Sequence, residues 1–128
     1  MGSSEELVRA TACDIVDRLR KNDITPHDLL DALETRIGKV DGQVNALPTL
    51  CFDRARAHAD KLMKKPTGER GLLAGMPVPI KDLTDVAGVL TTQGSPIFKD
   101  SIATKSNIVV ENLETNGAVI YAKSNTPE

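Results

Sequence analysis

Hydrophobic residues recur at helical spacing through the first part of the chain. From Ser4 to about Asn22, apolar side chains return at intervals of four, three and four residues, with charged residues on the opposite face. Acidic residues in the first turn suit the positive end of the helix dipole. The pattern therefore predicts one amphipathic helix over this segment, with a buried face made of Val8, Ala12, Ile15 and Leu19.

A second helix is predicted to begin at Thr25. A hydroxyl residue at the N-cap, Pro26 at the first helical position and Asp28 at the third are the residue types that helix starts favour. The buried stripe of this helix consists of Leu29, Leu30, Leu33, Ile37 and Val40.

A third helix is predicted after a short extended segment. Residues 44–50 fit an extended conformation limited by Pro48, and apolar side chains then return at helical spacing. Those apolar positions are Phe52, Ala55, Ala59, Leu62 and Met63. Arg54 and His58 fall on the opposite, solvated side, so we interpret all three helices as scaffold.

The chain changes character at a polar loop over residues 65–71, where proline and glycine interrupt regular structure. We interpret this loop as a boundary inside one domain, because 128 residues are the length of one ordinary domain. Residues 1–128 then form a single truncated domain, with a helical part over residues 1–64 and the start of an α/β core over residues 72–128.

Two strands are predicted in the second half. Residues 76–81 are β-prone, but Pro77 and Pro79 cannot donate ladder hydrogen bonds, so this strand begins at a sheet edge or a bend. Residues 118–122 form a second apolar strand, on which we expect Tyr121 to pack in the core or at the sheet edge.

A helix is expected between these strands. Ser106 can cap it, Asn116 and Gly117 can end it, and its apolar positions are Val109, Val110 and Leu113. Strand, helix and strand make a βαβ unit, which predicts a parallel pair joined by a right-handed crossover. Because two parallel strands are marginal alone, we expect another copy of the chain to cover the strand over residues 118–122.

Composition narrows the function classes. Hydrophobic residues make up 40% and charged residues 27% of the chain, which is a globular composition. The net charge is -2 with both signs interspersed, and aromatic residues are only 2%, so nucleic-acid binding is not expected. The N-terminus lacks the apolar stretch of a secretory signal, and no uncharged stretch has the length of a membrane span.

Cysteine, histidine and acidic residues indicate neither a metal site nor a cofactor. Cys13 and Cys51 are isolated, with no histidine at ligand spacing, so neither a zinc site nor a disulfide framework is predicted. Asp82 and Asp85 lack the carboxylate ladder of a calcium loop and are interpreted as solvated loop acids that cap turns. A reduced, cytoplasmic setting is the default expectation.

Several ordered blocks carry a resemblance to a known family. They read GLLAGMPVPIKDL over residues 71–83, DVAG over 85–88, TTQGS over 91–95, NGAVI over 116–120 and KSNTPE over 123–128. In this order and spacing they closely resemble the N-terminal part of amidase signature enzymes. The chain departs from the usual pattern where it has Ala122, Lys123, Ser124 and Asn125 in place of Gly-Lys-Thr-Asn, and where Ser106 replaces an acid.

The resemblance implies a fold and a chemistry. The fold class is α/β: N-terminal helices followed by the first βαβ unit of an amidase-signature-like mixed sheet. The chemistry is hydrolysis of small-molecule amides by a Ser/cis-Ser/Lys triad, in which Lys81 matches the lysine that acts as a neutral base through the cis-serine. We expect an apolar surround to disfavour the ammonium form of Lys81, because Val78 and Ile80 precede it on a strand heading into a core.

The two serines of the triad are not matched in this chain. In the family they lie in a Gly- and Ser-rich block beyond the segment that matches Glu128, where backbone amides also form the oxyanion hole. Ser3 and Ser4 fit a helix cap, and Ser95 is not in a nucleophile elbow. We therefore predict that the isolated chain does not hydrolyse amides.

Three functions stay open at this point. The first is the N-terminal portion of an amide hydrolase. The second is a small binding module that pairs with itself or with a partner through an unsatisfied strand edge. The third is a fragment of the amidotransferase component that releases ammonia from glutamine for tRNA-linked chemistry.

Overall fold

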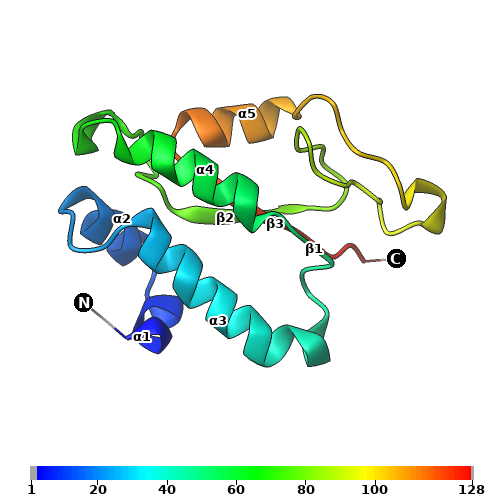
Figure 1. Cartoon of the computed structure of the whole chain (residues 1–128), viewed down its shortest axis with the longest axis horizontal. Coiled ribbons are helices and arrows are strands. Elements are labelled where there is room, and N and C mark those ends of the chain that lie inside the picture. The colour runs from blue at the N-terminus through cyan, green and yellow to red at the C-terminus, as the bar shows by residue number, and fades with distance from the viewer. Residues whose placement is uncertain (1–2, 128) are drawn as a thin grey trace.

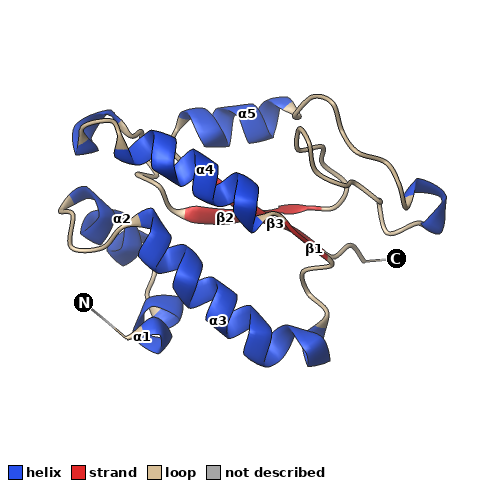
Figure 2. Cartoon of the chain, viewed as in Figure 1, coloured by secondary structure: helices blue, strands red, loops and turns tan. Residues whose placement is uncertain are grey.

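Helices lie on both sides of a small central sheet. The structure is a computed structural model that describes residues 3–127. Figure 1 shows α5 above the sheet, α1 and α3 below it, α2 to its left and α4 passing in front, and Figure 2 separates the helices from the strands. In chain order the elements are α1 (Ser4–Arg9), α2 (Ala12–Arg20), α3 (Pro26–Val44), β1 (Thr49–Leu50), α4 (Phe52–Met63), η1 (Thr67–Glu69), β2 (Pro77–Lys81), η2 (Pro96–Phe98), α5 (Ile108–Thr115) and β3 (Val119–Ser124).

The sheet has the order β1-β3-β2 within the described residues. β2 and β3 are parallel, as the βαβ pattern predicts, and β1 joins β3 antiparallel on its other side. The strand predicted over residues 118–122 is therefore central, and β1, α4 and β2 already cover it. The expectation that a second copy must cover this strand was wrong, because the short segment at Thr49–Leu50 pairs with it and the sequence pattern does not reveal that pairing.

Each face of the sheet has its own apolar cluster. On one face Val119 and Tyr121 pack with α3 and α4, and the Tyr121 ring centre lies 5.7 Å from that of Phe52. On the other face Ile80 and Ile120 pack with α5 and with the loop after β2. A third cluster joins α1 and α2 to the first turns of α3. The placement of Tyr121 in the core confirms its sequence interpretation.

The first segment forms two helices, so the prediction of one helix over residues 4–22 was wrong. Ala10 is extended, with a ψ angle of 151°, and the Thr11 side chain accepts a hydrogen bond from the Asp14 N–H as a new N-cap. The break changes which residues are buried: Leu7, Ile15 and Leu19 are buried, whereas Ala12 is exposed.

Helix α3 begins as predicted. Thr25 and Asp28 form a capping box, in which each side chain bonds the backbone N–H of the other residue, and Pro26 occupies the first turn. The helix continues to Val44 and ends at Asn45, which has a φ angle of 54°. The extended segment predicted over residues 44–50 is therefore shorter than expected.

Helix α5 ends at Asn116 and Gly117, as predicted, but Ser106 is not its cap. The Asn107 side chain accepts from the Val109 N–H at 2.9 Å and caps the helix. The Ser106 hydroxyl instead accepts from the Ala87 N–H at 2.9 Å, which ties the loop after β2 to the start of α5.

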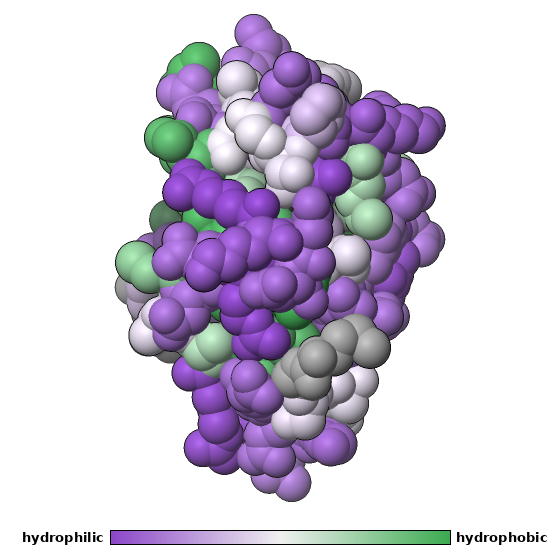
Figure 3. Space-filling model, turned by 90° about the vertical axis from the view of Figure 1, so that its left-hand side faces the viewer, coloured by the Kyte–Doolittle hydropathy of each residue, from purple (hydrophilic) through white to green (hydrophobic). Residues whose placement is uncertain are grey.

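The surface on the N-terminal side of the molecule is mostly hydrophilic, and Figure 3 shows its hydrophobic residues in separated patches. Within residues 3–127, no helix is both long enough and apolar enough to cross a membrane.

Candidate functional site

Lys81 is the last residue of β2 and its side chain is exposed. Side chains alternate along a strand, so Lys81 points away from the face on which Ile80 is buried. Its carbonyl accepts from the Thr84 N–H at 2.9 Å, which starts the turn after the strand. The apolar surround expected for Lys81 is not present among the described residues, because its side chain is exposed while those of its neighbours Ile80 and Asp82 are buried.

Asp82 is buried, with 2% exposure, and it is not the solvated loop acid that its sequence context predicts. Its carboxylate accepts from the Thr92 N–H at 3.1 Å and from the Thr92 hydroxyl. Its own N–H donates to the Ser124 carbonyl at 2.9 Å, and its carbonyl accepts from the Gln93 N–H at 3.0 Å. Every polar group of Asp82 thus bonds a neighbouring segment.

Lys123 is fully buried, with 0% exposure, and its sequence context alone did not point to a role. Its ammonium donates to the Thr91 hydroxyl at 3.0 Å and to the Asp82 carboxylate at 3.4 Å. Thr91 is itself only 3% exposed, so the ion pair lies in a polar site closed off from solvent. A sequence signal existed, since Lys123 directly follows five apolar residues of a central strand.

A register shift between β2 and β3 directs the Lys123 side chain toward Asp82. Val78 pairs with Ile120 and Ile80 pairs with Lys123, so β3 has one more residue than β2 between the two pairs. Tyr121 and Ala122 both pack in the cluster on the α3 side, and Lys123 then turns to the side of Ile80. Without the extra residue, strict alternation would place Lys123 on the opposite face.

Ser3 and Ser95 cap short helices, and Ser124 lies beside Lys81 in the sheet. The Ser3 hydroxyl accepts from the Glu6 N–H at 3.3 Å and caps α1, as predicted. The Ser95 hydroxyl accepts from the Ile97 N–H at 3.3 Å and caps η2. Ser124 is the register partner of Lys81, and the two side chains therefore share one face of the parallel pair.

A second polar cluster joins α4 to α5. Arg54 donates to Glu114 at 2.8 Å and to the Ala87 carbonyl at 3.3 Å, and the His58 Nδ1 lies 3.5 Å from Glu114. The prediction that Arg54 and His58 face solvent was wrong, because α5 packs over that side of α4. Burial lowers the pKa of the His58 imidazole from its ordinary value of 6.5, and the charge on Glu114 opposes this shift.

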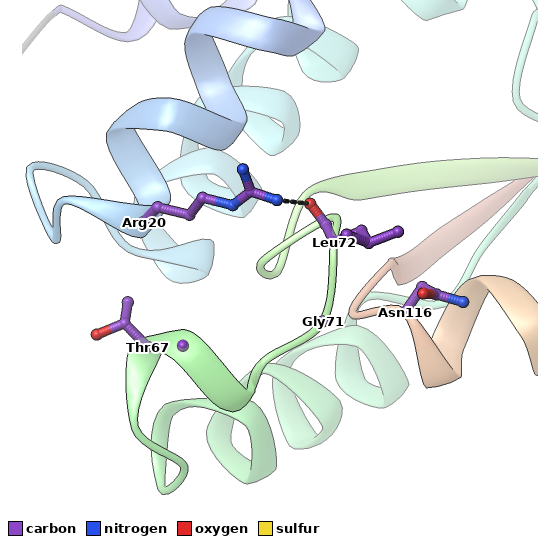
Figure 4. Close-up of a pocket in the computed structure, with 6 residues that line it drawn as sticks. Arg20, Thr67, Gly71, Leu72 and Asn116 are labelled. Atoms are coloured by element: carbon purple, nitrogen blue, oxygen red, sulfur yellow. Dashed lines mark hydrogen bonds between the residues drawn. The ribbon is translucent and has the colours of Figure 1, made fainter.

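A surface pocket lies beside the other end of β2. Figure 4 shows Arg20, Thr67, Gly71, Leu72 and Asn116 around it, with the Arg20 guanidinium donating to the Leu72 carbonyl at 2.9 Å. Lys81 is not among the residues that line this pocket. The lining residue Leu72 comes before the first residue of β2, whereas Lys81 is the last residue of that strand. Among residues 3–127, no group of three or more His, Cys, Asp or Glu side chains is arranged to hold a metal ion.

Comparison with known proteins identifies the family. A family model described as Amidase matches residues 28–128. The chain is 34% identical over 122 residues to an acylamidase of Rhodococcus erythropolis, a match that covers 92% of this chain and 25% of that protein. It is 39% identical over 114 residues to a glutamyl-tRNA(Gln) amidotransferase subunit of Koribacter versatilis (strain Ellin345), covering 86% of this chain and 23% of that one.

Solved structures agree with this assignment. An amidase family protein from Bacillus anthracis str. Ames superposes with a TM-score of 0.85 at 26% identity, covering 95% of this chain and 25% of that chain. The chain is an α/β protein with the fold of the corresponding part of that structure, and it belongs to the amidase family. It spans about a quarter of the length of the curated relatives it matches.

Proposed function

We propose that this chain forms the N-terminal part of an amidase signature hydrolase that acts on small-molecule amides, with Lys81 as its catalytic base. The observation that carries the proposal is the family match over residues 28–128, within which Lys81 ends β2 with its side chain exposed. A base must reach the group from which it takes a proton, so an accessible side chain is required at this position.

The proposed chemistry uses a Ser/cis-Ser/Lys triad. Neutral Lys81 takes a proton, through the bridging cis-serine, from the nucleophilic serine as that serine attacks the amide carbonyl. The same proton then passes to the leaving amine. We propose that both serines and the oxyanion donors lie outside residues 1–128, and that the 128-residue chain alone is inactive.

The first experiment is to sequence the source locus through and beyond codon 128. An in-frame Gly- and Ser-rich block with two spaced serines supports the hydrolase proposal. The protein encoded by the whole reading frame is then assayed for release of amine from a panel of aliphatic and aryl amides. An absent block together with no amide hydrolysis would contradict the proposal.

The role of Lys81 is tested in the same full-length protein. Because general-base catalysis contributes about 10²- to 10⁴-fold, we expect Lys81→Met to lower kcat by a factor in that range. The matched control is Lys99→Met, which removes an exposed lysine far along the chain from β2 and should leave kcat unchanged. Equal kcat values for the two variants would remove Lys81 from the mechanism.

A second candidate function has a specific observation in its favour. The relative from Koribacter versatilis is named as a glutamyl-tRNA(Gln) amidotransferase component, and it is 39% identical to this chain. Under this alternative the full-length protein would release ammonia from glutamine rather than from simple amides. Comparing ammonia release from glutamine with that from simple amides, in the presence of the other amidotransferase components of the source organism, distinguishes the two functions.

Partners and cellular setting are also proposed. We propose that the isolated chain associates with itself through the open edge of the sheet, which would make it a self-associating or partner-binding module if no hydrolase block follows. We propose a cytoplasmic setting because Cys13 and Cys51 are free thiols. No nucleic-acid or membrane partner and no metal or cofactor enters the proposed mechanism.

A further inference from the structure

We propose that Asp82 and Lys123 are positioning residues that hold Lys81 in place for catalysis from the opposite side of the sheet. This inference rests on the function proposed above for Lys81. It assigns a role to a buried ion pair that does not itself face the reacting groups.

Asp82 is fixed through its backbone and its side chain. Its N–H donates to the Ser124 carbonyl in β3 at 2.9 Å. Its carbonyl accepts from the Gln93 N–H in the loop after β2 at 3.0 Å. Its carboxylate is bonded by Thr92 and by the Lys123 ammonium. These bonds hold the backbone of residue 82, and with it the peptide bond that joins it to Lys81.

The direction of the Lys81 side chain depends on its two neighbours. Ile80 and Asp82 are both buried, and strand alternation then sends the Lys81 side chain to the other face. A lysine carries its amine on a flexible four-carbon stem, so its reach depends on a fixed Cα–Cβ direction. The buried side chain of Asp82 supplies that direction.

The ion pair is costly to bury. Burying two charges requires desolvation, and replacing a buried ion pair by apolar residues of similar size is often neutral or stabilising. Stability alone is therefore a weak reason for Lys123 and Asp82 to be buried at 0% and 2% exposure. The register shift in β3 turns Lys123 toward Asp82. Such irregularities are common beside active sites, where they redirect a side chain, and this one lies beside Lys81.

The test uses the full-length protein that contains this chain and measures kcat, KM and the thermal midpoint of unfolding. Lys123→Met leaves the Asp82 carboxylate buried without its cation, so the midpoint should fall. The double variant Lys123→Met with Asp82→Asn removes both charges and should regain most of that stability. Thr91→Val is a milder variant that removes only a hydroxyl to which Lys123 donates.

Positioning predicts a separation between stability and catalysis. We expect the double variant to regain stability while its kcat stays about 10- to 100-fold below that of the unchanged protein and its KM changes little, because small misplacements of a catalytic group cost about that much. Thr91→Val should also lower kcat, by a smaller factor than the double variant. If kcat recovers together with stability, or if Thr91→Val leaves kcat unchanged, the pair is merely structural and the inference is wrong.

Two controls keep this inference distinct from the proposed function. Lys105→Met removes an exposed lysine and should change neither kcat nor the unfolding midpoint. Lys81→Met reports on the proposed function: if it retains full activity, the proposed role of Lys81 fails. If Lys81→Met is inactive and the double variant has normal kcat, Lys81 stands and only the positioning role fails.

Discussion

Gly117 is a residue whose backbone no other amino acid adopts without strain. Its φ angle is +88°, and an added Cβ would lie 2.0 Å from the Arg70 carbonyl oxygen and 3.0 Å from the Ala74 nitrogen. We expect Gly117→Ala to destabilise the chain by about 2 kcal/mol or more, because backbone strain and a contact with rigid backbone add together. Urea unfolding followed by circular dichroism measures the change.

Gly38 provides the matched control for this substitution. It lies in α3, and a Cβ there would meet nothing within 4 Å. Gly38→Ala should raise the free energy of unfolding by about 0.5–1 kcal/mol, since alanine favours helices over glycine. Equal effects of the two substitutions would contradict the described packing between Gly117 and the turn at Arg70.

His58 is expected to make stability depend on pH. Its pKa is lowered in the folded chain by burial, with Glu114 raising it and Arg54, Lys61 and Lys65 acting with burial. The unfolded chain therefore binds more protons just below pH 6.5, and the stability that depends on neutral His58 is present above that pH and is lost on acidification.

The measurement compares the thermal midpoint at about pH 7.5 and about pH 5.5 in the unchanged chain and in His58→Gln. We expect a smaller drop on acidification in the variant than in the unchanged chain. Identical drops in the unchanged chain and in His58→Gln would show that His58 does not cause the pH dependence.

The motif that resembles the amidase signature predicted the place of Lys81 in the fold, and the catalytic role of Lys81 stays a prediction. Lys81 was located from its motif, and the structure puts it at the predicted end of a strand. Asp82 was misread because its neighbours suggested a solvated loop, and its burial depends on Thr92 and Lys123, which are distant in sequence. Arg54 was misread for the same reason, since its partner Glu114 lies sixty positions away.

At the scale of elements, local signals were the most reliable. The start of α3 and the end of α5 were predicted because a cap is made by residues within a few positions of one another. The break between α1 and α2 was missed, because the apolar spacing continues through Thr11 while the chain turns. The register shift in β3 leaves no mark in the hydrophobic pattern, since residues 118–122 are all apolar.

Thr11 gives a prediction at this scale. Its side chain accepts from the Asp14 N–H at 3.2 Å and caps α2, so Thr11→Ala should cost about 1 kcal/mol of stability. Thr35→Ala, at an exposed position inside α3, removes the same groups without a cap and should be neutral or slightly stabilising. Urea unfolding of both variants measures the difference, and equal effects would mean that the helices are not separated by a cap at Thr11.

At the scale of the whole molecule, the open edge of the sheet decides how copies can meet. The Met76 carbonyl bonds β3, so the backbone groups of Pro77 and Pro79 point outward, away from β3. Neither proline has an N–H, so this edge offers acceptors but few donors, a feature that limits strand pairing between copies. Self-association of the 128-residue chain through β2 should therefore be weak and dependent on concentration.

Restoring a donor at this edge should strengthen the association. Pro79→Val adds an outward N–H and a residue with high strand propensity, so we expect its average mass, measured by size exclusion with light scattering, to rise at lower concentration than that of the unchanged chain. Pro66→Val, in the loop before η1, adds an N–H away from the sheet and should behave like the unchanged chain. A clean monomer for the unchanged chain and for Pro79→Val at high concentration would end the proposal of self-association through this edge, because one of its two missing donors would have been restored without effect.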